Sequence, residues 1–301
     1  MGGIGAEREI SIQSGTCVAE ALRSAGFDVL TADVAPDRLD ILDDGSVDVF
    51  FPALHGEFGE DGQLQRILED KSLVYVGSGP VASETAFDKM AAKEAFVRAG
   101  VLTPAAIRFE RNIDAGMVAK RIASPVQKYV VKPIRQGSSF GVNIVSGLDN
   151  AIEAARTTAD EFGDCMIEEF IAGRELTVGI LCNEALPIIE IRPESGFYDY
   201  HAKYVDEQTG FLFDTLVEPA LVSQVQSAAL DCFGVLGCRD FSRVDFMLGE
   251  DNRAYALEVN TIPGFTSHSL LPKAAARAGL SMADLCAKII ETAGSSAQQR
   301  L

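Results

Sequence analysis

Short apolar runs alternate with segments of helical periodicity over the first third of the chain. Buried strands are predicted at 27–31, 47–51 and 73–76. Helices are predicted at 14–25, 63–70 and 84–99. Strands that alternate with helices in this way are typical of a parallel sheet that carries helices on its faces, and therefore of an α/β unit.

The remaining two thirds shows a different order of elements. Two β-branched runs, at 129–132 and 142–145, flank a Gly/Ser-rich loop and predict a hairpin. Further strands are predicted at 165–169, 176–182, 186–192, 243–248 and 254–259, and helices at 149–162, 221–233, 271–278 and 282–292. Strands that follow one another favour an antiparallel sheet and an α+β architecture. The predicted division is 1–83, 84–173 and 174–301.

Composition excludes several classes of function. The chain has 26 Lys+Arg against 44 Asp+Glu, a formal net charge of −18, which disfavours a nucleic-acid partner. No apolar run is long enough to span a bilayer, and the start lacks the pattern of a signal peptide. Six scattered cysteines without a CxxC pair are typical of a reducing compartment, so a cytoplasmic protein is expected. The three histidines lack the spacing of a zinc site.

A lysine precedes the Gly/Ser-rich loop of the predicted hairpin. Lys132 ends the first strand and is followed by the segment PIRQGSSFG. Loops of this composition bring backbone N–H groups close to phosphate oxygens, and a lysine adds positive charge there. The segment therefore indicates a phosphate site, although it is neither a P-loop nor a Rossmann fingerprint. A hairpin loop with a surface lysine is the alternative.

Two carboxylates and an amide are predicted to meet on the last hairpin. Arg243 and Asp245 share one face of their strand, and Glu258 and Asn260 share one face of the next. An all-oxygen set favours Mg²⁺ over zinc, and the neighbouring arginine suits a metal–phosphate complex. The apolar residues of the pair, Val244, Phe246, Leu257 and Val259, are predicted to lie on the opposite face. A solvated polar face is the alternative.

Three further segments are rich in reactive side chains. These are Glu-Arg-Glu at 7–9, the acidic turn HGEFGEDG at 55–62 and the loop YDYHAKY at 198–204. The turn follows a predicted strand, where α/β sheets place their ligands. The aromatic loop has the composition of a functional lid. The alternatives are a charge run that leads a helix for the first segment and a plain acidic turn for the second.

Taken in order, these segments resemble the D-alanine–D-alanine ligases, a family of the ATP-grasp superfamily. The matching segments are AEREISIQSG (6–15), HGEFGEDGQLQ (55–65), YVGSG (75–79), DK (88–89), VVKPIRQGSSFGV (130–142), IEEFIAGRELTVGIL (167–181), YDYHAKY (198–204), RVDFML (243–248) and EVNTIPGFTSHSLLP (258–272). Each is weak alone, but the ordered set is highly specific and covers almost the whole chain.

The resemblance implies a three-domain ATP-grasp fold with ATP held between the central and C-terminal domains. It implies that one D-alanine carboxylate attacks the γ-phosphate of ATP and that the amine of a second D-alanine then displaces phosphate, giving D-alanyl-D-alanine for peptidoglycan precursors. Phosphate serves as the leaving group that a carboxylate lacks, and Mg²⁺ and cationic side chains bring the two anions together. The family also suggests a homodimer.

Roles follow for residues that match the family's motifs. The expected ATP ligands are Lys89, Lys132 and Lys203 at the phosphates and Glu168 and Glu175 at adenine and ribose. The expected ligands of two Mg²⁺ ions (Mn²⁺ could replace them) are Asp245, Glu258 and Asn260.

Further roles concern the amino-acid substrates. Glu7, with His55 nearby, is expected to take the first D-alanine, and Arg243 with the backbone N–H of Gly264 to stabilise the oxyanion. Ser269 and the backbone of Leu270 are expected to bind the second carboxylate at a helix N-terminus. Ser138 and Tyr204 are expected to bridge to Glu7 and to close the segment 198–213 over the site.

Two departures from the family pattern leave questions open. Met1 stands where the family has an apolar strand, so we expect the natural product to start roughly ten residues upstream, about the length of one strand and turn. His201 replaces a common Glu in the lid. A ligase that takes D-lactate or D-serine as second substrate, and a silent nucleotide-binding scaffold, are the rival functions. Tyr204 favours D-alanine over D-lactate.

Overall fold

The computed structural model describes residues 1–5, 7–122, 127–193 and 209–298. Its helices are α1 (Arg8–Ser24), the 3₁₀ turn η1 (Asp40–Asp43), α2 (Gln63–Asp70), α3 (Pro80–Phe87), α4 (Lys89–Arg98), α5 (Ala115–Arg121), α6 (Leu148–Phe162), α8 (Pro219–Leu236), α9 (Leu270–Arg277) and α10 (Met282–Gln298). Its strands are β1 (Ala106–Arg108), β2 (Lys128–Pro133), β3 (Asn143–Ser146), β4 (Cys165–Glu169), β5 (Gly173–Leu181), β6 (Glu184–Ala185), β7 (Ile189–Arg192), β8 (Gly210–Leu212), β9 (Phe241–Gly249) and β10 (Ala254–Asn260).

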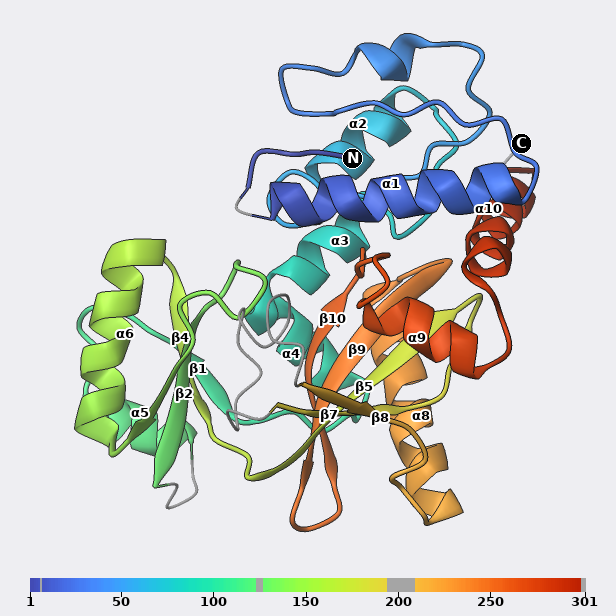
Figure 1. The fold of residues 1–301 in the computed structure, drawn as a ribbon. Helices are drawn as coiled ribbons and strands as arrows, with labels where there is room; N and C mark the ends of the chain where they lie inside the picture. Colours follow the sequence, from blue (N-terminus) through green and yellow to red (C-terminus); the bar gives the residue numbers. More distant parts are fainter. Residues whose placement is uncertain (6, 123–126, 194–208, 299–301) are drawn as a thin grey trace.

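Two antiparallel sheets form the framework of the described chain (Figure 1). The smaller has the order β1-β4-β2-β3, and its core is covered by α5 and α6. The larger has the order β10-β9-β5-β7-β8, with β6 paired to β5. The predicted hairpin around the Gly/Ser loop is present as β2 and β3, and the last predicted hairpin as β9 and β10. The α+β prediction is confirmed for this part of the chain.

Alternating residues of the larger sheet divide it into a buried face and a face toward the site. Leu176 and Val178 of β5 pack with Val244 of β9 in a core that α3, α4 and α8 cover. Glu175 and Thr177, which alternate with Leu176 and Val178 along the strand, point the other way because successive side chains of a strand alternate. Helix α4 thus packs against the larger sheet, although its N-terminus reaches the smaller one: the Lys89 N–H donates to the Ile134 carbonyl at 3.3 Å.

The single helix predicted at 84–99 is two helices. Asp88 interrupts the helical backbone with an extended conformation (φ −88°, ψ 99°), and its carboxylate accepts hydrogen bonds from the Met90 and Ala91 N–H groups. It is therefore an N-cap in the middle of the predicted helix. The consequence for the site is that Lys89 becomes the first residue of α4, and its side chain is turned toward the Gly/Ser loop.

The N-terminal part contains no regular strand in residues 1–5 and 7–78, so the strands predicted at 27–31, 47–51 and 73–76 are wrong as elements. Isolated bridges remain among these residues: two parallel ones, between Gly2 and Val34 and between Phe50 and Tyr75, and an antiparallel one between Ala35 and Arg38. A cavity of about 510 Å³, lined by Val29 and Val49 among other residues, separates the extended segments. An apolar run forms a ladder only where a neighbour lies about 4.8 Å away, and here open space takes that place.

Amide hydrogen exchange should distinguish the N-terminal part, which lacks a strand ladder in its described residues, from the larger sheet. The Val29 and Val49 N–H groups have no backbone acceptor within the described residues, whereas Val178 and Val244 lie in the ladder between β5 and β9. We expect the first pair to exchange at least about 100-fold faster than the second under native conditions. Hydrogen–deuterium exchange with site resolution measures this, and equal protection of all four amides would contradict it.

The N-terminal part is held to the rest by helix packing and by one polar junction. Helix α1 packs against α10 (Figure 1). At the junction the Gly77 N–H donates to Asp240 Oδ2 at 2.8 Å, and the Arg239 guanidinium lies 4.5 Å from the centre of the Tyr75 ring. These contacts join the YVGSG segment to the turn before β9.

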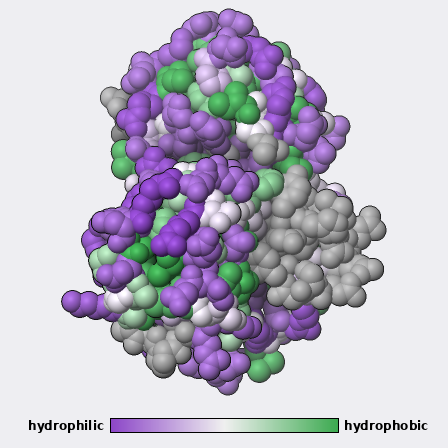
Figure 2. Space-filling model, turned by 90° about the vertical axis from the view of Figure 1, so that its left-hand side faces the viewer, coloured by the Kyte–Doolittle hydropathy of each residue, from purple (hydrophilic) through white to green (hydrophobic). Residues whose placement is uncertain are grey.

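The outer surface agrees with the acidic composition. The face on the α5 and α6 side is mostly hydrophilic, with small apolar patches (Figure 2). Among the helices described here, none combines the length and the apolar character needed to cross a bilayer.

Candidate active site

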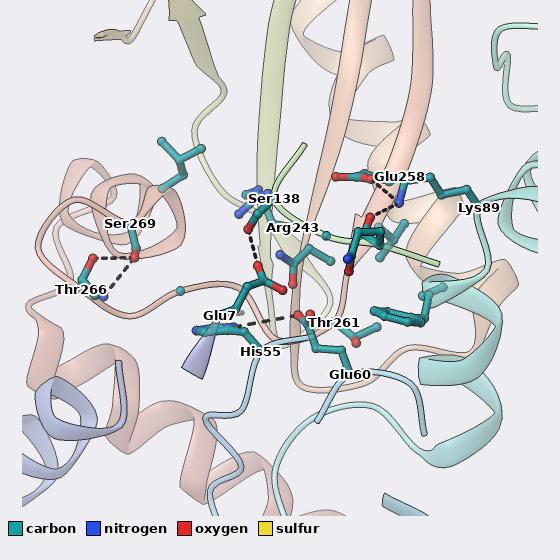
Figure 3. Close-up of a pocket in the computed structure, with 18 of the residues that line it drawn as sticks. Glu7, His55, Glu60, Lys89, Ser138, Arg243, Glu258, Thr261, Thr266 and Ser269 are labelled. Atoms are coloured by element: carbon teal, nitrogen blue, oxygen red, sulfur yellow. Dashed lines mark hydrogen bonds and ion pairs between the residues drawn. The ribbon is translucent and has the colours of Figure 1, made fainter. Parts of the chain in front are cut away.

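Two cavities meet between the sheets and the N-terminal part. The larger, of about 560 Å³, lies between the smaller and the larger sheet. The second, of about 110 Å³, is enclosed by all three parts of the chain (Figure 3). Lys89, Gln136 and Glu258 line both, so the two cavities are adjacent at these residues.

All predicted site residues within the described ranges line one or both of these cavities. The larger cavity receives Lys89, Lys132, Glu168, Glu175, Asp245 and Glu258. The smaller cavity receives Glu7, His55, Lys89, Ser138, Arg243, Glu258, Asn260, Gly264, Ser269 and Leu270. Lys203 and Tyr204, and with them most of the predicted lid, lie outside the described residues.

A buried carboxylate anchors two lysines in the larger cavity. Glu168, on β4, lies 2.7 Å from Lys132 Nζ through Oε1 and 2.8 Å from Lys93 Nζ through Oε2. Lys93 Nζ also donates to Thr103 Oγ1 at 2.8 Å and to the Pro104 carbonyl at 3.0 Å. The approach to Oε2 is oblique, and this oxygen has no well-directed donor among the described residues. Through Oε1, Glu168 holds Lys132 in the wall of the larger cavity.

The charges of this cluster shift its proton affinities. Burial would raise the pKa of Glu168, but the Lys132 and Lys93 ammonium groups hold it below its usual range. Burial lowers the pKa of Lys93 from 10.5 to about 8, although the Glu168 carboxylate opposes this shift. At neutral pH the cluster therefore contains one carboxylate and two ammonium groups.

Because the pKa of Lys93 is lowered in the folded chain, the free energy of unfolding should depend on pH. Since the folded pKa lies below the unfolded value, the unfolded chain binds more protons between pH 8 and 10.5, and the free energy of unfolding that Lys93 contributes rises with pH across this window. Lys93→Met removes the titration. The difference in unfolding free energy between the unmodified chain and the variant should increase by about 2–3 kcal/mol over this range. Urea titrations at several pH values measure it, and a flat difference would contradict the shift.

The register of β9 and β10 brings the predicted metal ligands together. Asp245 pairs directly with Glu258, and Arg243 with Asn260. The Asp245 carboxylate accepts from Thr177 Oγ1 at 2.6 Å and from Arg243 Nε and Nη2 at 2.9 and 2.7 Å. The predicted convergence of these four residues is confirmed, while Arg243 lies against Asp245 in this structure.

Leu257, on β10, lies on the face of the sheet opposite to the one predicted for it. A bulge between Ala256 and Glu258 shifts the register, so Leu257 lines the larger cavity instead of the core. The bulge coincides with a contact from another segment: the Ala256 N–H donates to the Leu102 carbonyl, and the Ala256 carbonyl accepts from Thr103 Oγ1. The backbone that precedes Glu258 is thereby fixed, as bulges beside functional sites commonly are.

The donor set at this hairpin fits Mg²⁺. It consists of two carboxylates and the Asn260 amide oxygen, which are hard ligands. Glu258 Oε2 lies 3.5 Å from Lys89 Nζ, so the site also carries a cation for phosphate. Within the described ranges no three His, Cys, Asp or Glu side chains gather as a metal site.

Glu7 is held at the junction of the N-terminal part and the Gly/Ser loop. Its carboxylate accepts a hydrogen bond from Ser138 Oγ. A Cβ atom at Gly137 would lie 2.9 Å from Glu7 Oε2, and one at Gly56, where φ is +73°, would lie 2.8 Å from it. A side chain at either position would displace the Glu7 carboxylate from this point, and at Gly56 the positive φ also favours glycine.

The opposite wall of the smaller cavity is the turn before α9. Ser269 is the N-cap residue of α9, and its Oγ lies 3.0 Å from the Thr266 N–H and 2.9 Å from Thr266 Oγ1 (Figure 3). The prediction that Ser269 and Leu270 open a helix is confirmed. The N–H groups of such a first turn favour an anion.

Several residues of the site were missed by sequence reasoning. Lys93 follows Lys89 by one helical turn, a spacing that predicts the same face of a helix and could have revealed it. Glu60 lies in the acidic turn and binds the Gly56 N–H at 2.7 Å. Ser14, on α1, gave no signal of its own because a serine in a helix is usually a surface residue.

Comparison with known proteins identifies the family. The family model described as "D-ala D-ala ligase C-terminus" matches residues 99–291, and "D-ala D-ala ligase N-terminus" matches residues 39–78. A D-alanine–D-alanine ligase from Methylacidiphilum infernorum is 40% identical over 290 residues, which cover 96% of this chain and 92% of that protein. The chain belongs to the D-alanine–D-alanine ligase family. The resemblance drawn from the motifs is confirmed, and the chain is an enzyme of this ATP-dependent class.

Solved structures agree with the fold. The D-alanine–D-alanine ligase from Bacillus anthracis has a TM-score of 0.87 at 33% identity and covers 100% of this chain and 98% of that one. Its complex with ATP has a TM-score of 0.83 at 30% identity, with coverage of 99% and 96%. The VanG D-Ala:D-Ser ligase from Enterococcus faecalis has a TM-score of 0.83 at 28% identity and covers 97% of each chain. The ATP-grasp fold predicted from the motifs is confirmed.

Proposed function

We propose that the chain joins two D-alanines to D-alanyl-D-alanine for peptidoglycan precursors, through an acylphosphate and with consumption of ATP. The observation that carries the proposal is that the two cavities lie next to each other and share Lys89 and Glu258 in their walls. A nucleotide in the larger cavity would present its terminal phosphate at this point, while a small amino acid would approach it from the smaller cavity. The domain division 1–83, 84–173 and 174–301 stays part of the proposal, although α3 and α4 pack on the larger sheet.

The nucleotide is proposed to lie between the sheets. Lys132 and Lys89 would contact its phosphates, and Glu168 and Glu175 its adenine and ribose. Lys203 is proposed as a third phosphate ligand on the grounds of its motif alone. Two Mg²⁺ ions would be held by Asp245, Glu258 and Asn260, where they would neutralise phosphate charge.

The first chemical step joins a carboxylate oxygen of D-alanine to the γ-phosphorus of ATP, and the bond to ADP breaks. Glu7, beside His55, is proposed to receive the ammonium group of this D-alanine, since it is the carboxylate held at the centre of the smaller cavity. Ser138 would keep it in place, and Tyr204 is proposed to complete this contact from the lid.

In the second step the amine of another D-alanine attacks the acyl carbon, and phosphate leaves with the bonding electrons. Ser269 and the N–H of Leu270 are proposed to bind the carboxylate of this D-alanine at the start of α9. The N–H of Gly264 and the Arg243 guanidinium would stabilise the negative oxygen of the tetrahedral intermediate. Arg243 must exchange part of its contact with Asp245 to do so.

Phosphate release tests the function. The purified chain with ATP and Mg²⁺ is given D-alanine, L-alanine, D-lactate or D-serine, and the products are separated by chromatography. We expect ADP, phosphate and dipeptide in equal amounts with D-alanine, and at least about 100-fold slower release with L-alanine. Preferential incorporation of D-serine or D-lactate as second substrate would reassign the specificity. No release with any of the four would favour a nucleotide-binding scaffold.

We also propose a homodimer and a cytoplasmic location. The dimer is supported by the family resemblance, and sedimentation analysis tests it because a monomer would have half the expected mass. The location is supported by six cysteines that are all free thiols, as in reducing compartments. Cell fractionation with an antibody against the chain tests it, and recovery outside the cytoplasmic fraction would contradict it.

A further inference from the structure

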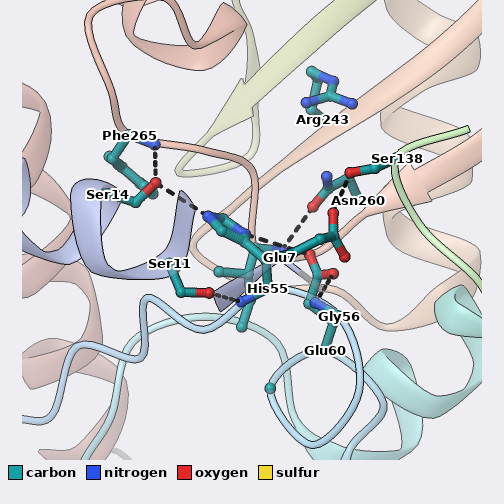
Figure 4. A network of polar contacts seen from close by, with 12 residues as sticks. Glu7, Ser11, Ser14, His55, Gly56, Glu60, Ser138, Arg243, Asn260 and Phe265 are labelled. Carbon is teal, nitrogen blue, oxygen red and sulfur yellow. Dashed lines mark hydrogen bonds and ion pairs between the residues drawn. The ribbon is translucent and has the colours of Figure 1, made fainter. Parts of the chain in front are cut away.

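Ser14 connects two parts of the smaller cavity without lining it. It lies on α1 with no exposed surface. Its Oγ lies 3.1 Å from His55 Nε2, on the turn of the N-terminal part, and accepts from the Phe265 N–H at 3.2 Å, next to Gly264 (Figure 4). One hydroxyl thus holds residues that are 41 positions downstream and 251 positions downstream in the chain.

The hydrogen-bond inventory of this hydroxyl sets the proton on the histidine. A serine hydroxyl has one hydrogen to donate, and a backbone N–H can only donate. The Phe265 N–H uses one lone pair of Ser14 Oγ. If the second lone pair accepted a hydrogen from His55 Nε2, the buried hydroxyl hydrogen would have no acceptor among the described residues, so we assign this hydrogen to His55 Nε2. An Nε2 that accepts has no hydrogen of its own, so the neutral ring carries its proton on Nδ1.

The other nitrogen faces a carboxylate that is itself fixed. His55 Nδ1 lies 4.0 Å from Glu60 Oε1. Glu60 Oε2 accepts from the Gly56 N–H at 2.7 Å, and the Glu60 N–H donates to the Gly56 carbonyl at 2.8 Å. A proton on Nδ1 is favoured by this carboxylate, so both sides of the ring support the same tautomer.

We propose that Ser14 is a positioning residue of the ligation site: it holds the ring of His55 in the wall of the smaller cavity, selects the Nδ1–H tautomer of the neutral form of this ring, and anchors the backbone beside Gly264. The proposal rests on the proposed function for its meaning in catalysis, but the tautomer is a property of the free protein. If the proposal holds, the single side chain of Ser14 fixes the position of the His55 Nδ1–H group relative to the backbone N–H of Gly264.

Nitrogen NMR of the histidine rings tests the proposal directly. The full chain is labelled with ¹⁵N-histidine, and spectra are recorded without substrates at about pH 8.5, above the usual imidazole pKa of about 6.5. The chain has three histidines, and His55→Gln identifies the signals of His55. We expect the unmodified protein to show a protonated Nδ1 and an unprotonated Nε2. A protonated Nε2 of His55 would overturn the proposal without any measurement on a serine variant.

Ser14→Ala and Ser11→Ala form a matched pair. Ser11 is equally buried on the same helix, but its Oγ accepts from the backbone N–H of His55 at 2.8 Å and makes no contact with the ring. We expect Ser14→Ala to shift His55 to a mixture that contains the Nε2–H form, and Ser11→Ala to keep the tautomer of the unmodified chain. An unchanged tautomer in Ser14→Ala, or an equal change in both variants, would overturn the proposal.

Kinetics separates this proposal from the proposed function. With D-alanine we expect Ser14→Ala to lower kcat/KM about 10-fold while the KM for ATP stays within about twofold, because the variant leaves the larger cavity unchanged. A parallel rise in the KM for ATP would indicate general damage and overturn the positioning role. If the unmodified chain shows the expected tautomer but makes no dipeptide, the proposed function fails and the hydrogen-bond assignment stands.

Discussion

Glu258→Gln is expected to lower kcat at least about 100-fold with no loss of folded structure. Glu258 lies opposite Asp245 in the β9–β10 register and within 3.5 Å of Lys89 Nζ, at the point where the two cavities join. Glutamine keeps the size of the side chain and removes the charge that both a Mg²⁺ ion and the lysine would use. Turnover with D-alanine is measured as phosphate release over a range of Mg²⁺ concentrations.

Glu250→Gln is the matched control for this change. Glu250 lies at the tip of the same hairpin and is exposed, so the same substitution there should leave turnover and Mg²⁺ dependence unaltered. Thermal melting of both variants shows whether the hairpin is intact. Retention of most of the turnover in Glu258→Gln, at an unaltered Mg²⁺ requirement, would mean that the metal is not bound at this hairpin.

Glu7→Gln is expected to reduce kcat/KM for D-alanine at least about 100-fold, which corresponds to the loss of one buried charge-assisted contact of about 3 kcal/mol. Its carboxylate is buried among Gly56, Gly137 and Ser138, and glutamine can still accept from the serine hydroxyl. The fold should therefore survive while the charge for the substrate ammonium is lost.

Nucleotide binding should stay within about twofold in this variant, since Glu7 does not line the larger cavity. A fluorescent ATP analogue measures it. Glu9→Gln, an exposed position two residues along the same helix, is the control and should leave both quantities unaltered. A small change in kcat/KM for Glu7→Gln would move the first D-alanine away from this carboxylate.

Much of the C-terminal two thirds of the fold could be predicted because its two hairpins, β2–β3 and β9–β10, join strands that are close in sequence. The short strands β1 and β8 were not predicted, and β1 pairs with β4, which is distant in sequence. The pairing of Asp245 with Glu258 followed from alternation along two strands and a short connection between them. Leu257 escaped this reasoning because its bulge depends on Leu102 and Thr103, which contact β10 from a distant part of the chain. The alternation of apolar and polar residues along a strand does not reveal where a β-bulge inserts an extra residue.

The N-terminal part shows a second limit of prediction from sequence, because strands were predicted there that the structure does not have. Apolar runs at 27–31 and 47–51 have the composition of strands, yet composition does not state whether a neighbouring strand is in reach. The site there was found through glycine and acidic motifs, which described Glu7 and His55 correctly as cavity residues. Ser14 could not be predicted from any motif, because its hydrogen bond to the Phe265 N–H forms only when α1 packs against that distant backbone.

The contacts of the smaller cavity also have a consequence for the order of events during protein synthesis. Glu7 meets Ser138 only after more than a hundred further residues have been added, and Ser14 meets Phe265 only after 251. The larger cavity depends on the same late segment, because Asp245 and Glu258 line it. Both cavities are therefore completed together, only when the β9–β10 hairpin and the turn before α9 are in place.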